Sequence, residues 1–244
     1  LPTFVINPLH ANLYRKSLSL RKTKTDKVDC TIIAGMLMSD VDLKPYSRAL
    51  YHSTELKSLT RYRFDKIQQR AKLKISITRL VTILFPELPS LVSKIHIPSI
   101  YALLSEYPSA EAIATAHLTK LTGLLEKSSK GKFSKATAIL FRDTARTSIG
   151  ASMPAKSLEL KHTIKLIGTI CAEIEEIECE INRIMATINS PITTIPGIGR
   201  MTGAQILAEI GDFQNFSSPD KILAFAGLSP STYHSGQLYS SYAK

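Results

Sequence analysis

The chain of 244 residues has no tryptophan and only three cysteines, Cys30, Cys171 and Cys179. Their odd number and the lack of a CxxC spacing imply neither a disulfide framework nor a zinc site, so we expect a reduced, cytoplasmic environment. No run of 18 apolar residues occurs, which excludes a membrane-spanning helix. The first residues, Leu1 to Phe4, show neither an initiator methionine nor a signal peptide. This start is typical of a piece from the middle of a gene product.

Acidic residues are scarce beside basic ones. The chain has 20 Asp and Glu against 31 Lys and Arg, a net charge of +11 at pH 7. Such an excess favours a polyanionic partner, either nucleic acid or an anionic membrane surface. The length is sufficient for one large domain or two modest ones.

Two long helices are predicted, one from Ser53 or Thr54 to just before Pro86 and one over residues 158–188. The first helix has two parallel apolar stripes, and two stripes require two neighbours. We therefore expect an antiparallel pair of helices within one chain and a homo-oligomer, a dimer or tetramer, around it. The stripes are Leu73, Ile77, Leu80 and Leu84, and beside them Phe64, Ile67, Ala71 and Ile75.

The polar side of the first long helix is strongly basic. Its cations face a single acid, Asp65, whereas a solvated helix usually mixes charges of both signs. This pattern predicts a surface that binds phosphates. The cations are Arg61, Arg63, Lys66, Arg70, Lys72, Lys74 and Arg79, of which Arg61, Arg63, Lys66, Arg70 and Lys74 are the leading candidates. The second long helix carries five glutamates over residues 173–180, which are expected to complement the basic helix.

A tight turn is predicted at Ile195-Pro196-Gly197-Ile198-Gly199, directly before a helix that ends at Gly211. Gly197 and Gly199 permit positive φ and leave backbone N–H groups uncovered. The free N–H groups and the dipole of a helix N-terminus bind phosphate. A second helix is predicted to start at Ser218-Pro219 and end near Gly227. Two helices joined in this way are typical of a helix-hairpin-helix module, which contacts nucleic-acid backbone without reading sequence; a plain helical turn is the alternative.

Two carboxylates, Asp26 and Asp29, fall in the first turn of a helix that Thr25 is predicted to cap. Acids favour this end of a helix dipole for stability alone. Residues three apart also share one helix face, so the pair can hold a hard cation such as Mg²⁺. The helix follows a β-prone run, Thr3 to Asn7, which Pro8 ends, and a basic bridge over residues 15–24.

The sequence resembles the DEDD-type insertion-sequence transposases, the relatives of the Piv invertase that are also called bridge-RNA-guided recombinases. The residues that carry the resemblance are Lys-Thr-Asp-Lys-Val-Asp at its N-terminal end and, at its C-terminal end, Gly-Ile-Gly, Leu-Ala-Glu-Ile-Gly-Asp-Phe, Phe-Ala-Gly-Leu-Ser-Pro and Ser235-Gly236. The resemblance implies that Asp26 and Asp29 are the last two acids of the DEDD set and that Ser235 is the nucleophile. No general base for Ser235 is identifiable.

The resemblance also implies a fold and a division of labour. The expected fold is mainly α, with the C-terminal part of a RuvC-like (RNase H-type) α/β domain in residues 1–47. A helical coiled-coil region follows in residues 48–190, and a C-terminal transposase domain with the helix-hairpin-helix in residues 191–244. The implied function is Mg²⁺-dependent cleavage and exchange of DNA strands, with a guide RNA choosing the sequence. The first two acids of the set are expected before Leu1, so the chain alone is expected to be inactive.

Two other functions fit part of the sequence. A non-enzymatic module for nucleic-acid binding and dimerisation explains the charge and the helices, but it gives Asp26, Asp29 and Ser235 no role. A degenerate remnant of a mobile element explains the missing acids.

Overall fold

The computed structural model describes residues 3–4, 6–19, 25–39, 51–235 and 238–243, which divide into two compact units, Leu1–Tyr51 and His52–Lys244. The first unit contains two packed helices, α1 (Pro8–Leu18) and α2 (Asp26–Met38). Thr25 caps α2 as predicted, because its Oγ1 accepts the N–H of Val28 at 3.3 Å. Ile32 and Met36, one turn apart, are the buried residues of α2.

The prediction of a strand before Pro8 is wrong for the residues that the structure describes. Thr3, Phe4, Ile6 and Asn7 lie in irregular backbone. A strand needs a neighbour to satisfy its backbone groups, and the two described strands, β1 and β2, pair with each other. Instead, Asn7 caps α1 by accepting the N–H of Leu9 at 2.9 Å. Pro8 therefore begins a helix, a position that its missing N–H favours, and the first part of the predicted basic bridge is helical.

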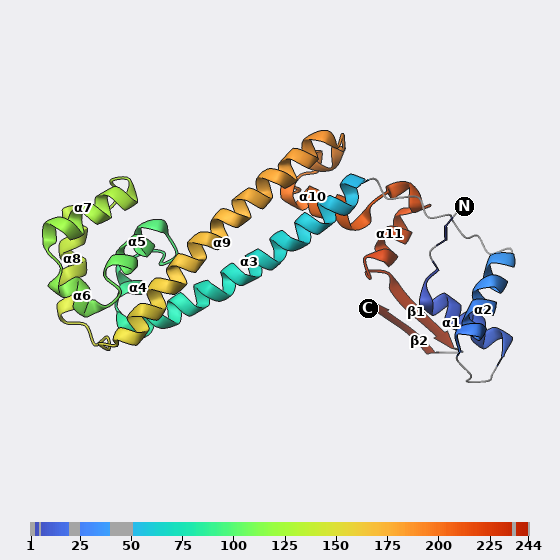
Figure 1. Cartoon of the computed structure of the whole chain (residues 1–244), viewed down its shortest axis with the longest axis horizontal. Coiled ribbons are helices and arrows are strands. Elements are labelled where there is room, and N and C mark those ends of the chain that lie inside the picture. Colours follow the sequence, from blue (N-terminus) through green and yellow to red (C-terminus); the bar gives the residue numbers. More distant parts are fainter. Residues whose placement is uncertain (1–2, 5, 20–24, 40–50, 236–237, 244) are drawn as a thin grey trace. The chain divides into compact units, whose positions relative to one another are not determined.

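The second unit is built on two helices of 34 residues each, α3 (Tyr51–Leu84) and α9 (Pro154–Thr187). They lie side by side over most of their length (Figure 1). Arg63 contacts Glu178, and Lys66 contacts Glu173, so the partner on α9 moves back as the position on α3 moves forward. The predicted antiparallel pair is therefore confirmed. Both helices begin earlier than predicted, and Pro154 occupies the first turn of α9.

Five short helices cover one end of this pair and enclose the larger hydrophobic core. They are α4 (Leu88–Leu91), α5 (Pro98–Glu106), α6 (Ala110–Thr115), α7 (Leu118–Ser129) and α8 (Lys135–Arg146). The core joins the end of α3 and the start of α9, with Phe85 and Phe141 fully buried. Of the first predicted stripe, Ile77, Leu80 and Leu84 lie in this core.

A smaller core lies at the other end of the long helices. There α10 (Arg200–Ile210) packs on α9, and its Ala204 and Ala208 share a buried cluster with Leu56 of α3. The chain reaches α10 through a 3-10 turn, η1 (Pro191–Thr194), and continues through η2 (Phe213–Asn215) and α11 (Pro219–Phe225). It ends in an antiparallel hairpin of β1 (Pro230–Ser235) and β2 (Leu238–Ala243). The α10 and α11 boundaries agree with the prediction.

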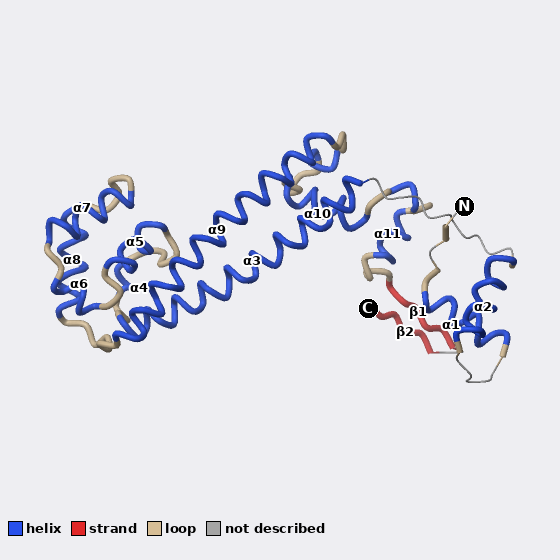
Figure 2. The backbone as a smooth tube through the Cα atoms, in the orientation of Figure 1, coloured by secondary structure: helices blue, strands red, loops and turns tan. Residues whose placement is uncertain are grey.

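Helices account for most of the described residues, and the described strands are the two of the C-terminal hairpin (Figure 2). The mainly α fold class is therefore confirmed. None of the described helices is both long and apolar enough to cross a membrane. Cys171 packs beside the larger core, whereas Cys179 is exposed.

Candidate nucleic-acid interface and catalytic residues

The carboxylates of Asp26 and Asp29 stand in the first turn of α2, where the helix dipole favours negative charge. Asp26 is exposed and Asp29 is half-buried. Asp29 also lines a cavity of about 580 Å³ between α1 and α2. Asn12 and Arg15 of α1 line the same cavity, and the Arg15 guanidinium donates to Asn12 Oδ1 at 2.8 Å. Of the two carboxylates, Asp29 therefore borders a cavity that has polar and apolar side chains in its walls.

The donor chemistry of this pair suits a hard divalent cation, because carboxylate oxygens are the ligands that Mg²⁺ prefers. Two carboxylates provide only part of an octahedral shell. In the described ranges, no group of three or more His, Cys, Asp or Glu side chains is placed to hold a metal ion. Asp26 and Asp29 thus fit a metal as a partial site that needs further oxygen ligands.

Ser235 is the last residue of β1, and Leu238 is its partner in the antiparallel register. The structure therefore places Ser235 at the C-terminal end of a strand. Its neighbour Gly236 lies outside the described residues. Ser235 belongs to the second unit, whereas Asp26 and Asp29 belong to the first.

The glycine turn before α10 has the backbone geometry of a type II turn. The N–H of Ile198 donates to the carbonyl of Ile195 at 3.0 Å, and Gly197 has a φ of 89°. Pro196 and Gly197 occupy the two central positions, which this turn type favours for these residues. Gly199 instead has a φ of −76° and serves as the N-cap of α10. Of the two glycines that permit positive φ, only Gly197 adopts it, and the uncovered helix start is as predicted.

The helix start after Gly199 is open to a ligand. No side chain caps α10, and a Cβ at Gly197 or Gly199 would meet no atom within 4 Å. The first N–H groups of a helix have no intrahelical partner. Uncapped N–H groups without a covering side chain can donate to phosphate oxygens.

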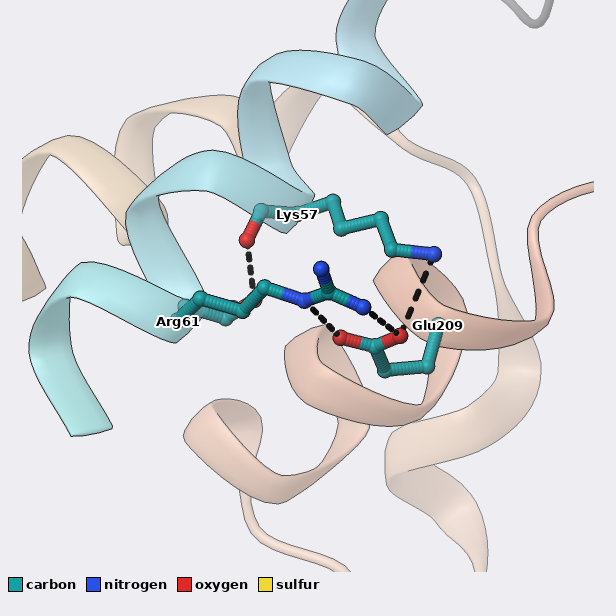
Figure 3. A network of polar contacts seen from close by, with 4 residues as sticks. Lys57, Arg61 and Glu209 are labelled. Atoms are coloured by element: carbon teal, nitrogen blue, oxygen red, sulfur yellow. Dashed lines mark hydrogen bonds and ion pairs between the residues drawn. The ribbon is translucent and has the colours of Figure 1, made fainter. Parts of the chain in front are cut away.

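The start of α3 is bound to α10 by a bidentate ion pair (Figure 3). Arg61 Nε and Nη2 donate to Glu209 Oε1 and Oε2 at 2.7 and 2.9 Å. Lys57 Nζ lies 3.1 Å from Glu209 Oε2. The bond from Arg61, aided by Lys57 and opposed by partial burial, lowers the pKa of Glu209 to about 2. Charge patterning of α3 alone missed Lys57 and Glu209, although Glu209 lies within the Leu-Ala-Glu-Ile-Gly segment.

Two more of the leading phosphate-binding candidates pair with α9. Arg63 Nη2 lies 2.5 Å from Glu178 Oε1, and Lys66 Nζ lies 2.6 Å from Glu173 Oε2. The bond to Glu173 raises the pKa of Lys66. The acidic face of α9 therefore neutralises part of α3, as the sequence predicts. In the described residues, Arg70 and Lys74 form no ion pair.

The comparisons with known proteins match both ends of the chain. A transposase family model of the DEDD, IS110 type matches residues 1–86, which include Asp26 and Asp29. A model described as the transposase IS116/IS110/IS902 family matches residues 189–242, which include the glycine turn and Ser235. The two matches occur at opposite ends of the chain and concern one group of insertion elements.

Individual relatives agree with these matches. An uncharacterised protein of insertion element IS116 from Streptomyces clavuligerus is 26% identical over 90% of this chain and 56% of its own length. A putative transposase for IS117 from Streptomyces coelicolor is 23% identical over 96% of this chain and 59% of its own length. The transposase for IS1328 from Yersinia enterocolitica is 37% identical over 28% of this chain and 21% of its own length. The chain thus spans little more than half the length of the first two relatives. It belongs to the IS110/IS116/IS902 family of DEDD-type insertion-sequence transposases.

Proposed function

We propose that the chain is part of a DNA transposase that cleaves and exchanges strands with Ser235 as nucleophile. The observation that carries this proposal is the order of the two family matches, each of which contains its own predicted catalytic residues. The fold proposed with it is the C-terminal part of a RuvC-like domain in residues 1–47, a coiled-coil region in 48–190 and a helix-hairpin-helix domain in 191–244. The antiparallel pair of α3 and α9 supports the second assignment, and the turn before α10 supports the third.

The proposed reaction is a transesterification. The Ser235 hydroxyl oxygen forms a bond to the scissile phosphorus, the bond to one sugar oxygen breaks, and the proton from serine ends on that leaving oxygen or in water. The resulting phosphoserine ester retains the energy of the phosphodiester. The sugar hydroxyl of an exchanged strand then attacks the same phosphorus and releases serine.

Asp26 and Asp29 are the proposed metal-binding residues. A divalent ion such as Mg²⁺, when bound, supplies charge neutralisation at the phosphate oxygens. The two carboxylates are too few for a complete site, so we propose that residues 1–244 alone do not cleave DNA. Further acids from the full-length protein complete the set.

Nucleic-acid binding is proposed for α3 and the start of α10. Arg70 and Lys74 carry the strongest phosphate contacts, because Arg61, Arg63 and Lys66 already face carboxylates. The N–H groups after Gly197 and Gly199 add a contact that needs no side chain. DNA and a guide RNA are the proposed partners, in a cytoplasmic setting.

A homo-oligomer, dimer or tetramer, is also proposed. The described part of the chain leaves most of the second apolar stripe of α3 exposed, although Ile67 is half-buried. Phe64 is 51% exposed and Ile75 is 71% exposed. Large apolar side chains in a row on a helix favour a partner of the same kind.

The test is the covalent protein–DNA adduct formed by the full-length protein with Mg²⁺, its DNA and its guide RNA. Ser235→Ala should abolish the adduct and leave DNA binding unchanged, and Asp29→Asn should abolish cleavage. Ser231→Ala, a serine of the same strand, is the matched control and should retain the adduct. An adduct that persists in Ser235→Ala would refute the nucleophile, and binding without any adduct in the wild-type protein would favour the non-enzymatic module.

A further inference from the structure

A cavity of about 450 Å³ lies in the second unit, where α5 meets the pair of α3 and α9. Figure 1 shows α5 beside the two long helices at this end. Arg70 and Lys74 of α3, Tyr101 of α5, and Ile164 and Gly168 of α9 line the cavity. Its size falls within the range of small-ligand pockets, and apolar walls with a few polar groups are typical of them.

The cavity carries uncompensated positive charge. Arg70 and Lys74 are four residues apart, so both project from the same face of α3. Each is half-buried, and neither forms an ion pair within the described ranges. No acidic residue is among those that line the cavity. One turn earlier, Lys66 is neutralised by Glu173, so the two cations here remain available to an anion.

One wall of the cavity is held in a fixed, neutral state. Thr78 Oγ1 donates its hydrogen to the carbonyl of Lys74 at 3.0 Å, so it accepts from His96 Nε2 at 3.1 Å. The other ring nitrogen, Nδ1, then accepts from the Tyr101 hydroxyl at 3.0 Å. Burial lowers the pKa of His96 and raises that of Tyr101 to about 12. Both rings are therefore uncharged at neutral pH, and the charge of the cavity comes from Arg70 and Lys74.

The α9 side of the cavity is open. Gly168 is exposed, and a Cβ there would meet no atom within 4 Å. Lys161 and Lys165 precede Gly168 by seven and three residues, which places all three along one side of α9. Both lysines are exposed, and neither forms an ion pair in the described residues. The positive surface therefore continues past the cavity along α9.

We propose that this cavity binds one nucleotide of a single-stranded nucleic acid, with the phosphate on Arg70 and Lys74 and the base against Tyr101 and the apolar floor at Ile164. The inference rests on the proposed nucleic-acid function and deepens it. Stacking on an aromatic side chain beside a basic groove is the common way to hold a single strand without reading its sequence. The lysines beyond the rim favour a strand over a free nucleotide, because they offer contacts to further phosphates.

The test measures binding of the chain to fluorescent single-stranded DNA and RNA of mixed sequence by anisotropy, over a range of salt concentrations. Gly168→Leu fills the open side and should weaken binding roughly tenfold, the effect of losing about one stacked base. It should leave the salt slope unchanged, because no charge is removed. Replacing Arg70 and Lys74 together with Gln should weaken binding and also flatten the slope by about 0.7 per lost phosphate contact.

Matched controls separate the cavity from the fold and from general charge. Gly168→Ala adds a methyl group only and should bind as the wild type does. Lys72→Gln removes an exposed cation of α3 that does not line the cavity, and it should lower the slope without the tenfold loss. Melting temperatures of both Gly168 variants should not fall, since glycine is the weaker helix former.

Three results would overturn the inference. Equal affinity of wild type and Gly168→Leu would exclude the cavity while leaving nucleic-acid binding by the rest of the chain intact. Adenosine monophosphate that binds the wild type but not Gly168→Leu, with strand affinity unchanged, would assign the cavity to a free nucleotide. Wild-type protein that binds no nucleic acid at all would refute the proposed function itself. Photocrosslinking of a thiouridine-containing strand to Tyr101 in the wild type, lost in Gly168→Leu, would support binding of a nucleotide in the cavity.

Discussion

Gly150 lies in the loop from α8 to α9, at a point where the loop passes very close to the end of α3. A Cβ at this position would stand 2.5 Å from the carbonyl oxygen of Leu84 and 2.9 Å from its carbonyl carbon. Both are backbone atoms, so no side chain can turn away. Gly150→Ala must push the loop back by nearly an ångström before the contact becomes ordinary.

Two sets of bonds hold the loop at this distance. The N–H of Ala151 donates to the carbonyl of Ile83 at 2.8 Å and satisfies one of the last carbonyls of α3. Glu87 accepts from the Ser148 hydroxyl at 2.5 Å and from the N–H of Ile149 at 3.0 Å. Burial raises the pKa of Glu87, but these bonds outweigh it and hold the pKa below its usual value. A retreat of the loop weakens both sets.

The expected loss is that of one neutral hydrogen bond, about 1 kcal/mol, and one bond to a charged group, about 1.5–3 kcal/mol. Gly150→Ala should therefore lower the free energy of unfolding by about 2.5–4 kcal/mol. For a chain of this size, this corresponds to a fall of roughly 5–15 °C in melting temperature. Far-UV circular dichroism of the wild type and the variant on heating measures it.

The matched controls are Gly123→Ala in α7 and Gly168→Ala in α9, helical glycines whose added Cβ meets nothing within 4 Å. Each should hold or raise the melting temperature, because alanine is favoured over glycine in a helix by about 0.5–1 kcal/mol. A Gly150→Ala variant that melts at the wild-type temperature would refute the steric reasoning.

Three further predictions concern charge and assembly. Glu209→Gln should lower the melting temperature at pH 7. Since the pKa of Glu209 in the folded chain, about 2, lies below the usual 4.5, the difference in melting temperature from wild type should be full above about pH 5 and vanish as the pH falls towards 2. A pH-independent difference would contradict the ion pair. Lys66→Glu should destabilise the chain and adding Glu173→Lys should restore much of the loss, as measured by urea unfolding; a double variant no better than the single would show that the two residues do not interact. Ile75→Glu should shift the proposed homo-oligomer towards monomer in sedimentation, with exposed Lys72→Glu as the control. An unchanged distribution would exclude the second stripe from the interface.

The sequence by itself determined the helical parts that depend on local pattern. The two long helices, the Thr25 cap and the Ser218-Pro219 start follow from apolar periodicity and from residues that satisfy helix ends without distant partners. The position of Asp26 and Asp29 in one helical turn could be predicted for the same reason, since it depends only on their spacing and on the cap. Family membership also came from local motifs, which the comparisons confirm.

Features that depend on residues far apart in the sequence were decided only by the tertiary structure. The run before Pro8 looks like a strand, but without a pairing strand in the described residues Asn7 caps a helix instead. The cations of α3 look alike in sequence, yet Arg61 and Lys66 are neutralised by Glu209 and Glu173, far along the chain, whereas Arg70 borders an open cavity. Charge patterning counts residues of one sign, but whether a cation is available depends on which acid the fold brings within a few ångströms of it.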